Sequence, residues 1–312
     1  MLFNAYSSDW DKFGSVGRNV VTQIICGNIQ KLSTYAYDLG MATIEQYLDE
    51  HLAHGRAYFT REEAQAALGL ASHPLSVTLL RQARKGRLAN PRRGFYLILR
   101  PEDRTLGAPD PVRWIEPLMK YLKLDYRIAL LRAAAFHGSS HQAAMVFQVI
   151  VPRQMRGFEI GRQRLEFIYQ SPAAFRQINR PDWLGSLKSE AGFAQVAGLE
   201  LTLLDCARYF HKAAGVNSLA QIAKDLGGRS RPIELASIAA HYENSSVRRL
   251  GYLLERAGHV QQAEALRPFA RKAKTTVLLD PSIKPLVEGL SALHEKAPDW
   301  RLIINETVEV DS

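Results

Sequence analysis

The sequence SHPLSVTLLRQARKGRLANPRRGFYLIL, Ser72 to Leu99, lies in a part of the chain between Glu63 and Glu102 that contains no acidic residue. The same interval contains these basic residues: Arg81, Arg84, Lys85, Arg87, Arg92, Arg93 and Arg100. A surface with charge of one sign attracts ligands of the opposite sign, and phosphate is the commonest anion on nucleic acids. The stretch therefore indicates a phosphate-bearing partner.

The first part of this stretch is predicted to form a helix over Leu75–Lys85. Ser72 is a suitable N-cap, Pro74 falls in the first turn, where its missing N–H costs little, and Gly86 favours a stop. At about 100° per residue, the apolar half of the helix comprises Val77, Leu79, Leu80 and Ala83. The opposite stripe, predicted to face solvent, comprises Thr78, Arg81, Gln82 and Lys85.

The segment upstream predicts a partner for the apolar half. Thr60 and Glu63 have capping-box spacing at the start of an Ala-rich helix over Arg61–Leu68, which ends at Gly69. Two helices joined by a short turn make a helix-turn-helix unit. A further helix over Thr43–Leu52 is predicted to come before it.

The segment downstream predicts a hairpin. After Gly86 the hydrophobic pattern changes to a period of two, and the turn residues 90–94 separate two apolar runs. Arg92 and Arg93 fall at the tip of this hairpin. Together with the helices, the hairpin makes the predicted unit a winged helix-turn-helix.

This arrangement favours DNA as the partner. An exposed helix fits the major groove, where Arg and Lys donate to guanine and Gln pairs with adenine, while arginines of the wing approach phosphates or the minor groove. The predicted DNA-binding residues are Thr78, Arg81, Gln82, Lys85, Arg87, Arg92 and Arg93. The alternative is a solvated basic face on a small domain, with Arg81 or Arg84 forming salt bridges to Glu62 or Glu63.

The whole chain is basic and long enough for two domains. It has 312 residues, with 40 Lys and Arg against 31 Asp and Glu, which gives a net charge of +9. Residues 1–40 form a poorly integrated extension, and Met41 is a candidate for the true start of translation. Residues 41–105 form the predicted winged helix-turn-helix domain, and residues 106–312 form a larger mixed α/β C-terminal domain. The expected fold class is α+β.

The C-terminal part begins after a segment rich in Gly and Pro, Arg104–Pro111, which is predicted to be a linker. Helical and strand patterns alternate after it. Helices are predicted at Asp125–Phe136, Leu199–His211, Ser218–Leu226, Pro232–His241 and Val247–Ala257. Strands are predicted at Ala144–Val151 and Arg164–Tyr169. The expected architecture is a mixed domain closed by helices.

The sequence offers little chemistry, and we expect neither an enzyme nor a cofactor. His137 and His141 have metal-ligand spacing, but the residues between them favour a helix end, and no third ligand is adjacent. Thr202 and Asp205 have the spacing of a capping box. Phosphate loops, nucleophile elbows and dinucleotide fingerprints are absent from the sequence. No metal site is therefore predicted.

The cysteines and the hydrophobic pattern argue against disulfides, a zinc site, a membrane span and a signal peptide. Cys26 and Cys206 are far apart and belong to no CxxC motif, which argues against a disulfide framework and a zinc site, and Cys206 is expected in a helix core. The longest uncharged run, Ala133–Pro152, is interrupted by polar residues, and the N-terminus lacks a signal-peptide pattern. A cytoplasmic protein without a membrane partner is therefore expected.

Several motifs in order resemble a known family. After the predicted winged helix and the Pro-rich linker come HGSSHQ, FQVIVP, LELTLLDCARY and SSVRRLGYLLERAG. This order resembles AbiEi-type antitoxins of type IV toxin-antitoxin and abortive-infection systems. The resemblance runs from about Met41 to near Gly258, and residues 1–40 have no counterpart in it.

The resemblance implies an antitoxin that acts in phage defence and represses its own operon. Its winged helix would bind inverted repeats in the promoter. Its C-terminal domain would oppose a nucleotidyltransferase-like toxin without a stable complex. A secondary basic surface comprising Arg153, Arg156, Arg248 and Arg249 is also implied, although the last two could instead edge a packing helix.

Two other functions remain open at this stage. The chain could be an interaction module that neutralises a partner protein directly, or a DNA-binding regulator unrelated to a toxin. An enzyme that acts on nucleic acid would need an acidic metal site, which the sequence does not supply.

Overall fold

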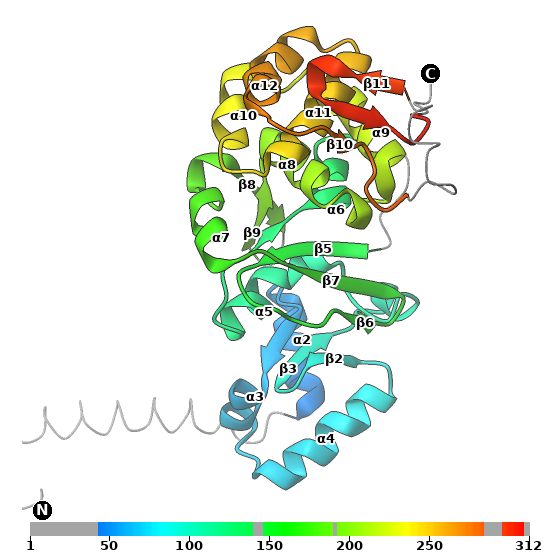
Figure 1. Ribbon diagram of the computed structural model, residues 1–312. Helices are drawn as coiled ribbons and strands as arrows, with labels where there is room; N and C mark the ends of the chain where they lie inside the picture. Colours follow the sequence, from blue (N-terminus) through cyan, green and yellow to red (C-terminus); the bar gives the residue numbers. More distant parts are fainter. Residues whose placement is uncertain (1–42, 140–145, 190–191, 284–294, 309–312) are drawn as a thin grey trace, which may run out of the picture.

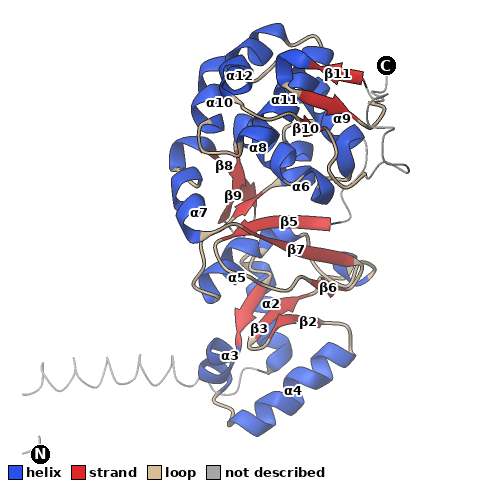
Figure 2. Cartoon of the chain, viewed as in Figure 1, coloured by secondary structure: helices blue, strands red, loops and turns tan. Residues whose placement is uncertain are grey.

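The computed structural model describes residues 43–139, 146–189, 192–283 and 295–308. The described chain is elongated, with a small unit at one end, a mixed sheet in the middle and a group of helices at the other end (Figure 1). Helices and strands occur in both halves (Figure 2). The fold is therefore mixed α+β, as the sequence predicts.

The N-terminal unit, residues 43–98, combines three helices with an antiparallel sheet in the order β1-β3-β2. Its elements are α2 (Ile44–Ala53), β1 (Tyr58–Thr60), α3 (Arg61–Leu68), α4 (Ser72–Arg84), β2 (Leu88–Arg92) and β3 (Phe95–Ile98). Thr60 and Glu63 form the predicted capping box at the start of α3, and Gly69 ends that helix in the left-handed conformation.

Helix α4 begins earlier than predicted. Its N-cap is Ala71, which provides no side-chain hydrogen bond, and Ser72 is already helical. Arg61 of α3 contacts the first turn of α4, because its guanidinium donates to the carbonyl and hydroxyl oxygens of Ser72 and to the hydroxyl of Ser76. A contact from the preceding helix therefore fixes the start of α4.

A six-stranded sheet lies at the centre of the C-terminal part, in the order β6-β7-β5-β4-β9-β8. Its strands are β4 (Arg127–Ile128), β5 (Val146–Val151), β6 (Phe158–Ile160), β7 (Gln163–Tyr169), β8 (Leu184–Ser189) and β9 (Gly192–Ala197). The β4–β9 and β5–β7 pairs are parallel, and the other neighbours are antiparallel.

The predicted helix from Asp125 is wrong in its first part. Arg127 and Ile128 are extended as β4 between β5 and β9. The helix α6 (Leu130–Phe136) starts only after this strand. A two-residue strand has no period that a sequence pattern could reveal, which is why the prediction merged it with the helix.

Helices cover the sheet and fill the far end of the molecule (Figure 1). They are α5 (Ile115–Tyr121), α6, α7 (Pro172–Ile178), α8 (Leu199–Arg208), α9 (Gly215–Gly227), α10 (Pro232–Ala239), α11 (Asn244–Arg256) and α12 (Val260–Lys272). Helix α8 is buried along nearly its whole length, and Cys206 lies in the core as predicted. Burial raises the pKa of the Cys206 thiol above its usual value.

A small sheet adds to the helices at this end. It has the order β10-β12-β11 and comprises β10 (Val277–Leu278), β11 (Glu295–Ala297) and β12 (Leu302–Ile304). The buried Trp300 ring lies where a Cβ on Gly251 of α11 would be, so only glycine fits there.

The N-terminal unit is packed firmly on the C-terminal part. Phe95 and Leu97 of β3 belong to the main hydrophobic core, together with Leu118 of α5 and its N-cap residue Trp114. The predicted linker is tightly packed, because the amide of Arg162 donates to the Leu106 carbonyl at 2.7 Å. These contacts fix where α4 lies relative to the sheet.

We expect Gly161→Ala to loosen this joint. A Cβ at residue 161 would overlap the Leu106 carbonyl oxygen and lie 2.6 Å from the Cα of Gly107. Overpacking should lower the free energy of unfolding by about 1–3 kcal/mol, in addition to the cost of a left-handed alanine. The control is Gly69→Ala, because Gly69 has nearly the same φ, +61° against +57°, and open space around its Cβ position. Equal losses in the two variants, measured by denaturant titration, would contradict the close approach.

Candidate functional site

The outward face of α4 differs from the predicted one by a rotation of about one residue. Leu75, Leu79 and Gln82 are the buried residues of α4, whereas Val77 and Leu80 are 36% and 52% exposed. The predicted placement of Gln82 in the outward stripe is therefore wrong, and Thr78 is half-buried.

A polar contact with α2 explains the position of Gln82. Its amide nitrogen donates to a carboxylate oxygen of Glu45 at 2.5 Å. This hydrogen bond is the main reason why the pKa of Glu45 is lower than usual, and Lys85 adds to the effect. The inner face of α4 thus contains a polar residue that is held by α2, which hydrophobicity alone cannot predict.

The outward face of α4 is nevertheless basic. Arg81, Arg84 and Lys85 are exposed, and Lys85 also lies 3.6 Å from Glu45. Arg84 was not among the predicted contact residues, although it follows Leu80 at the helical spacing of four. The exposed cations therefore lie along the last two turns of the helix.

The hairpin β2–β3 presents fewer free cations than predicted. Arg87 forms an ion pair with Asp49 of α2. Arg92 lies over the rings of Phe158 and Phe167, at 4.6 and 5.8 Å, and donates to the carbonyl of Arg156 at 2.7 Å.

Arg92 and Arg93 lie at the tip of the hairpin, as predicted, but the Arg92 side chain packs on the C-terminal part. Burial against the C-terminal part lowers its pKa. Arg93 remains exposed, and its carbonyl accepts a hydrogen bond from the Tyr121 hydroxyl. The hairpin thus offers Arg93 to solvent and uses Arg92 for packing.

The predicted secondary basic surface separates into two pairs. Arg153 and Arg156 are exposed in the connection between β5 and β6, and the Arg156 carbonyl contacts Arg92 of β2. Arg248 and Arg249 are only 3% and 8% exposed, so their inclusion in a basic surface is wrong.

Both buried arginines hold main-chain carbonyls. Arg248 donates to Thr275 and Arg301, while Arg249 donates to Leu278 and Leu279. Burial lowers the pKa of both guanidinium groups. Their role in the structure is to attach α11 to the segment around β10.

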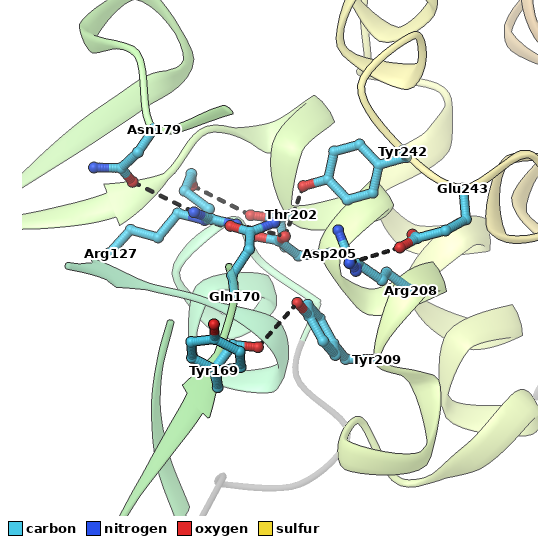
Figure 3. Close-up of polar contacts among 11 residues, drawn as sticks. Arg127, Tyr169, Gln170, Asn179, Thr202, Asp205, Arg208, Tyr209, Tyr242 and Glu243 are labelled. Atoms are coloured by element: carbon cyan, nitrogen blue, oxygen red, sulfur yellow. Dashed lines mark hydrogen bonds and ion pairs between the residues drawn. The ribbon is translucent and has the colours of Figure 1, made fainter. Parts of the chain in front are cut away.

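A fully buried ion pair lies between the sheet and α8 (Figure 3). Arg127 of β4 donates from Nε and Nη2 to the two carboxylate oxygens of Asp205, at 2.9 and 2.8 Å. Burial opposes the charge on Arg127, but Asp205 outweighs it and raises the pKa of the guanidinium. This two-pronged geometry is the strongest form of an arginine–carboxylate contact.

Residues of three further segments complete the cluster (Figure 3). The Tyr242 hydroxyl, which follows α10, donates to Asp205 at 2.7 Å. Arg127 also donates to the side-chain oxygens of Gln170 and Asn179, at 3.0 and 3.4 Å. Burial, and then the negative charge of Asp205, raise the pKa of Tyr242, which stays neutral.

The interpretation of Thr202 and Asp205 as a capping box is wrong. Helix α8 begins at Leu199, and the Thr202 hydroxyl donates to the Ala197 carbonyl instead. The sequence did contain a signal for the cluster, since an aspartate inside the apolar run LTLLDCA needs a buried cation. Its partner, Arg127, lies too far along the chain for spacing to identify it.

The described residues show no arrangement suited to metal binding. Within them, no three His, Cys, Asp or Glu side chains are grouped to hold an ion. The ring of His137 is bonded to the Ala197 carbonyl at 2.8 Å, and His141 lies outside the described residues. None of the described helices is both long and apolar enough to cross a membrane.

The C-terminal part is therefore an α+β domain organised around a buried arginine–aspartate pair. Residues 127–256 match the family of the AbiEi antitoxin C-terminal domain. This match confirms the resemblance over residues 127–256, a range that contains Arg127, Asp205 and Tyr242. An AbiEi antitoxin domain indicates an antitoxin role in a toxin-antitoxin system, and such a role implies a toxin partner.

Comparisons with other proteins add information on the fold. A solved structure described as the crystal structure of RV2827C protein from Mycobacterium tuberculosis is similar over 83% of this chain and 90% of that chain. The TM-score is 0.58 and the sequence identity 16%, so the likeness concerns the fold alone. No curated protein matches the chain.

We expect the buried pair to be essential for folding. Arg127→Met leaves the Asp205 carboxylate without its counter-ion, and Asp205→Leu leaves the guanidinium unpaired. Each should cost about 3–5 kcal/mol of unfolding free energy, and the double variant should cost less than the sum. The ion pair between the exposed Lys120 and the half-buried Glu116 provides a control, because Lys120→Met should change stability by about 0.5 kcal/mol or less. Additive losses in denaturant titrations would contradict the coupling.

Proposed function

We propose that this chain is the antitoxin and transcriptional autorepressor of a type IV toxin-antitoxin operon. The match of residues 127–256 to the AbiEi antitoxin domain carries the antitoxin part of the proposal. The toxin would be a nucleotidyltransferase-like protein encoded beside it, opposed without a stable complex. We expect both proteins in the cytoplasm.

The exposed face of α4 supports the DNA-binding part of the proposal. The N-terminal unit has the element order helix, strand, helix, helix, strand, strand, which is that of a winged helix-turn-helix. Helix α4 would be its recognition helix, and the hairpin β2–β3 its wing. Among the described residues, helix α4 lies at the end opposite α10–α12 (Figure 1).

The distribution of exposed positive charge also supports α4 as the recognition helix and the hairpin β2–β3 as the wing. Arg81, Arg84 and Lys85 are exposed on α4, and Arg93 is exposed on the wing. In the proposed complex, α4 occupies the major groove of an inverted repeat in the promoter, and Arg93 contacts the backbone. Arg156 lies beside the wing, and with the exposed Arg153 of the same connection it would extend the positive charge towards flanking phosphates.

We expect α4 substitutions to weaken binding to promoter DNA taken from upstream of the chain's own gene. Arg81→Ala, Arg84→Ala or Lys85→Ala should each cost about 1–3 kcal/mol if the residue contacts a base, or reduce the salt dependence of binding if it contacts phosphate. Arg271→Ala provides a matched control, because Arg271 is exposed on α12 at the other end of the molecule. Unchanged affinity and unchanged salt slope in all three variants, in fluorescence-anisotropy titrations, would refute the recognition-helix assignment.

We expect neutralisation and repression to be separable. When the neighbouring gene and this chain are expressed from unrelated promoters, the chain should restore growth, and the Arg81→Ala/Arg84→Ala variant should restore it equally. The same variant should lose repression of a reporter placed behind the chain's own promoter. Growth that is not restored by the parent chain would contradict the antitoxin role and leave a DNA-binding regulator unrelated to a toxin.

A direct protein-interaction module is the second candidate function. It predicts that the chain and the neighbouring gene product co-purify, and that substitutions on α4 abolish neutralisation. The type IV proposal predicts neither result, so affinity purification of a tagged chain separates the two.

A further inference from the structure

Two apolar side chains lie at the centre of the exposed face of α4. Val77 and Leu80 are 36% and 52% exposed, and both point away from the residues that pack on α2 and the sheet. At about 100° per residue, His73 and Arg84 fall on the same stripe, with Arg81 on its flank. The centre of the face is therefore apolar and its C-terminal half cationic.

The charge of the residues around Val77 and Leu80 indicates which kind of partner could bind the exposed face of α4. Helix α4 contains no acidic residue, and the neighbouring carboxylate, Glu45, is already bonded to Gln82. A second copy of the chain would bring the same arginines against Arg81 and Arg84, which repel one another. A polyanion that carries small apolar groups satisfies both the charge and the exposed side chains.

Double-stranded DNA has such a group in its major groove, the 5-methyl group of thymine. We propose that Val77 and Leu80 contact thymine methyl groups, while Arg84 contacts a neighbouring base pair. This inference rests on the proposed DNA-binding function and adds the base chemistry that α4 recognises.

The spacing along the helix agrees with the spacing of base pairs. At about 1.5 Å of rise per residue, Val77 and Leu80 are separated by about 4.5 Å along the axis, and Leu80 and Arg84 by about 6 Å. Base pairs are about 3.4 Å apart. In the proposed complex, with α4 lying along the major groove, Val77 and Leu80 would contact adjacent or nearly adjacent base pairs, and Arg84 one further along.

The test replaces thymine with uracil, which has the same hydrogen-bonding groups but lacks the methyl. Duplexes are first enriched on the full-length chain from a library with a randomised central segment. The best duplex is then synthesised with thymine or with uracil at each position, and both forms are titrated. Uracil should weaken binding about fourfold for each methyl contacted, which corresponds to about 0.8 kcal/mol for one buried carbon.

Variants of the chain show which residues cause the preference for thymine over uracil. Leu80→Ala and Val77→Ala should each reduce the preference for thymine over uracil, whereas Arg81→Ala should weaken both duplexes to a similar degree. Ile233→Ala is the matched control, because Ile233 is a highly exposed apolar residue on α10, and it should leave the preference unchanged.

The outcomes separate this inference from the function on which it rests. Enrichment of a sequence whose uracil and thymine forms bind equally would overturn the methyl contact and leave DNA binding intact. A thymine preference that survives in both alanine variants would also overturn it. Failure to enrich any duplex would refute the proposed DNA binding together with this inference. If Leu80→Ala changes the molar mass in light scattering and leaves the preference intact, the face is a contact between copies, and the proposal is wrong.

Discussion

The pairing of Arg127 with Asp205 is the contact on which the C-terminal domain depends. It joins the short strand β4, in the middle of the sheet, to α8, in the middle of the helices. Two charges without water are tolerated only when hydrogen bonds complete both groups, and Tyr242, Gln170 and Asn179 supply them. One ion pair thus fixes the end of α7, the end of β7 and the turn after α10 around a single point.

A second set of contacts attaches the N-terminal unit to the six-stranded sheet. Arg92 stacks on Phe158 and Phe167, and Phe95 extends the main core across the boundary. The exposed cations of α4 and the exposed Arg153 and Arg156 are therefore held in a fixed relation. The six-stranded sheet thus positions the surface proposed for DNA through its contacts with the wing.

The sequence predicted most of the elements but not the details of the surfaces. Capping residues, glycine stops and apolar periods located α2, α3, the hairpin and α8–α11, because these signals act over a few neighbouring residues. The face of α4 was misplaced because Gln82 is buried against Glu45, a contact made across 37 positions. Arg248 and Arg249 were misassigned for the same reason, since the carbonyls that bury them belong to distant segments. Hydrophobic periodicity contains no information on such partners.

The core that crosses the boundary also determines which length of chain is a folding unit. Residues 127–256 are recognisable as a family, yet Trp114 and Leu118 before them and Trp300 after them are buried in the same core, as are Phe95 and Leu97 of the N-terminal unit. In an isolated 127–256 fragment, the apolar residues that pack against these side chains would be exposed to water. The N-terminal unit and the C-terminal part should therefore unfold in one cooperative transition. The segment that matches the family is shorter than the unit that folds.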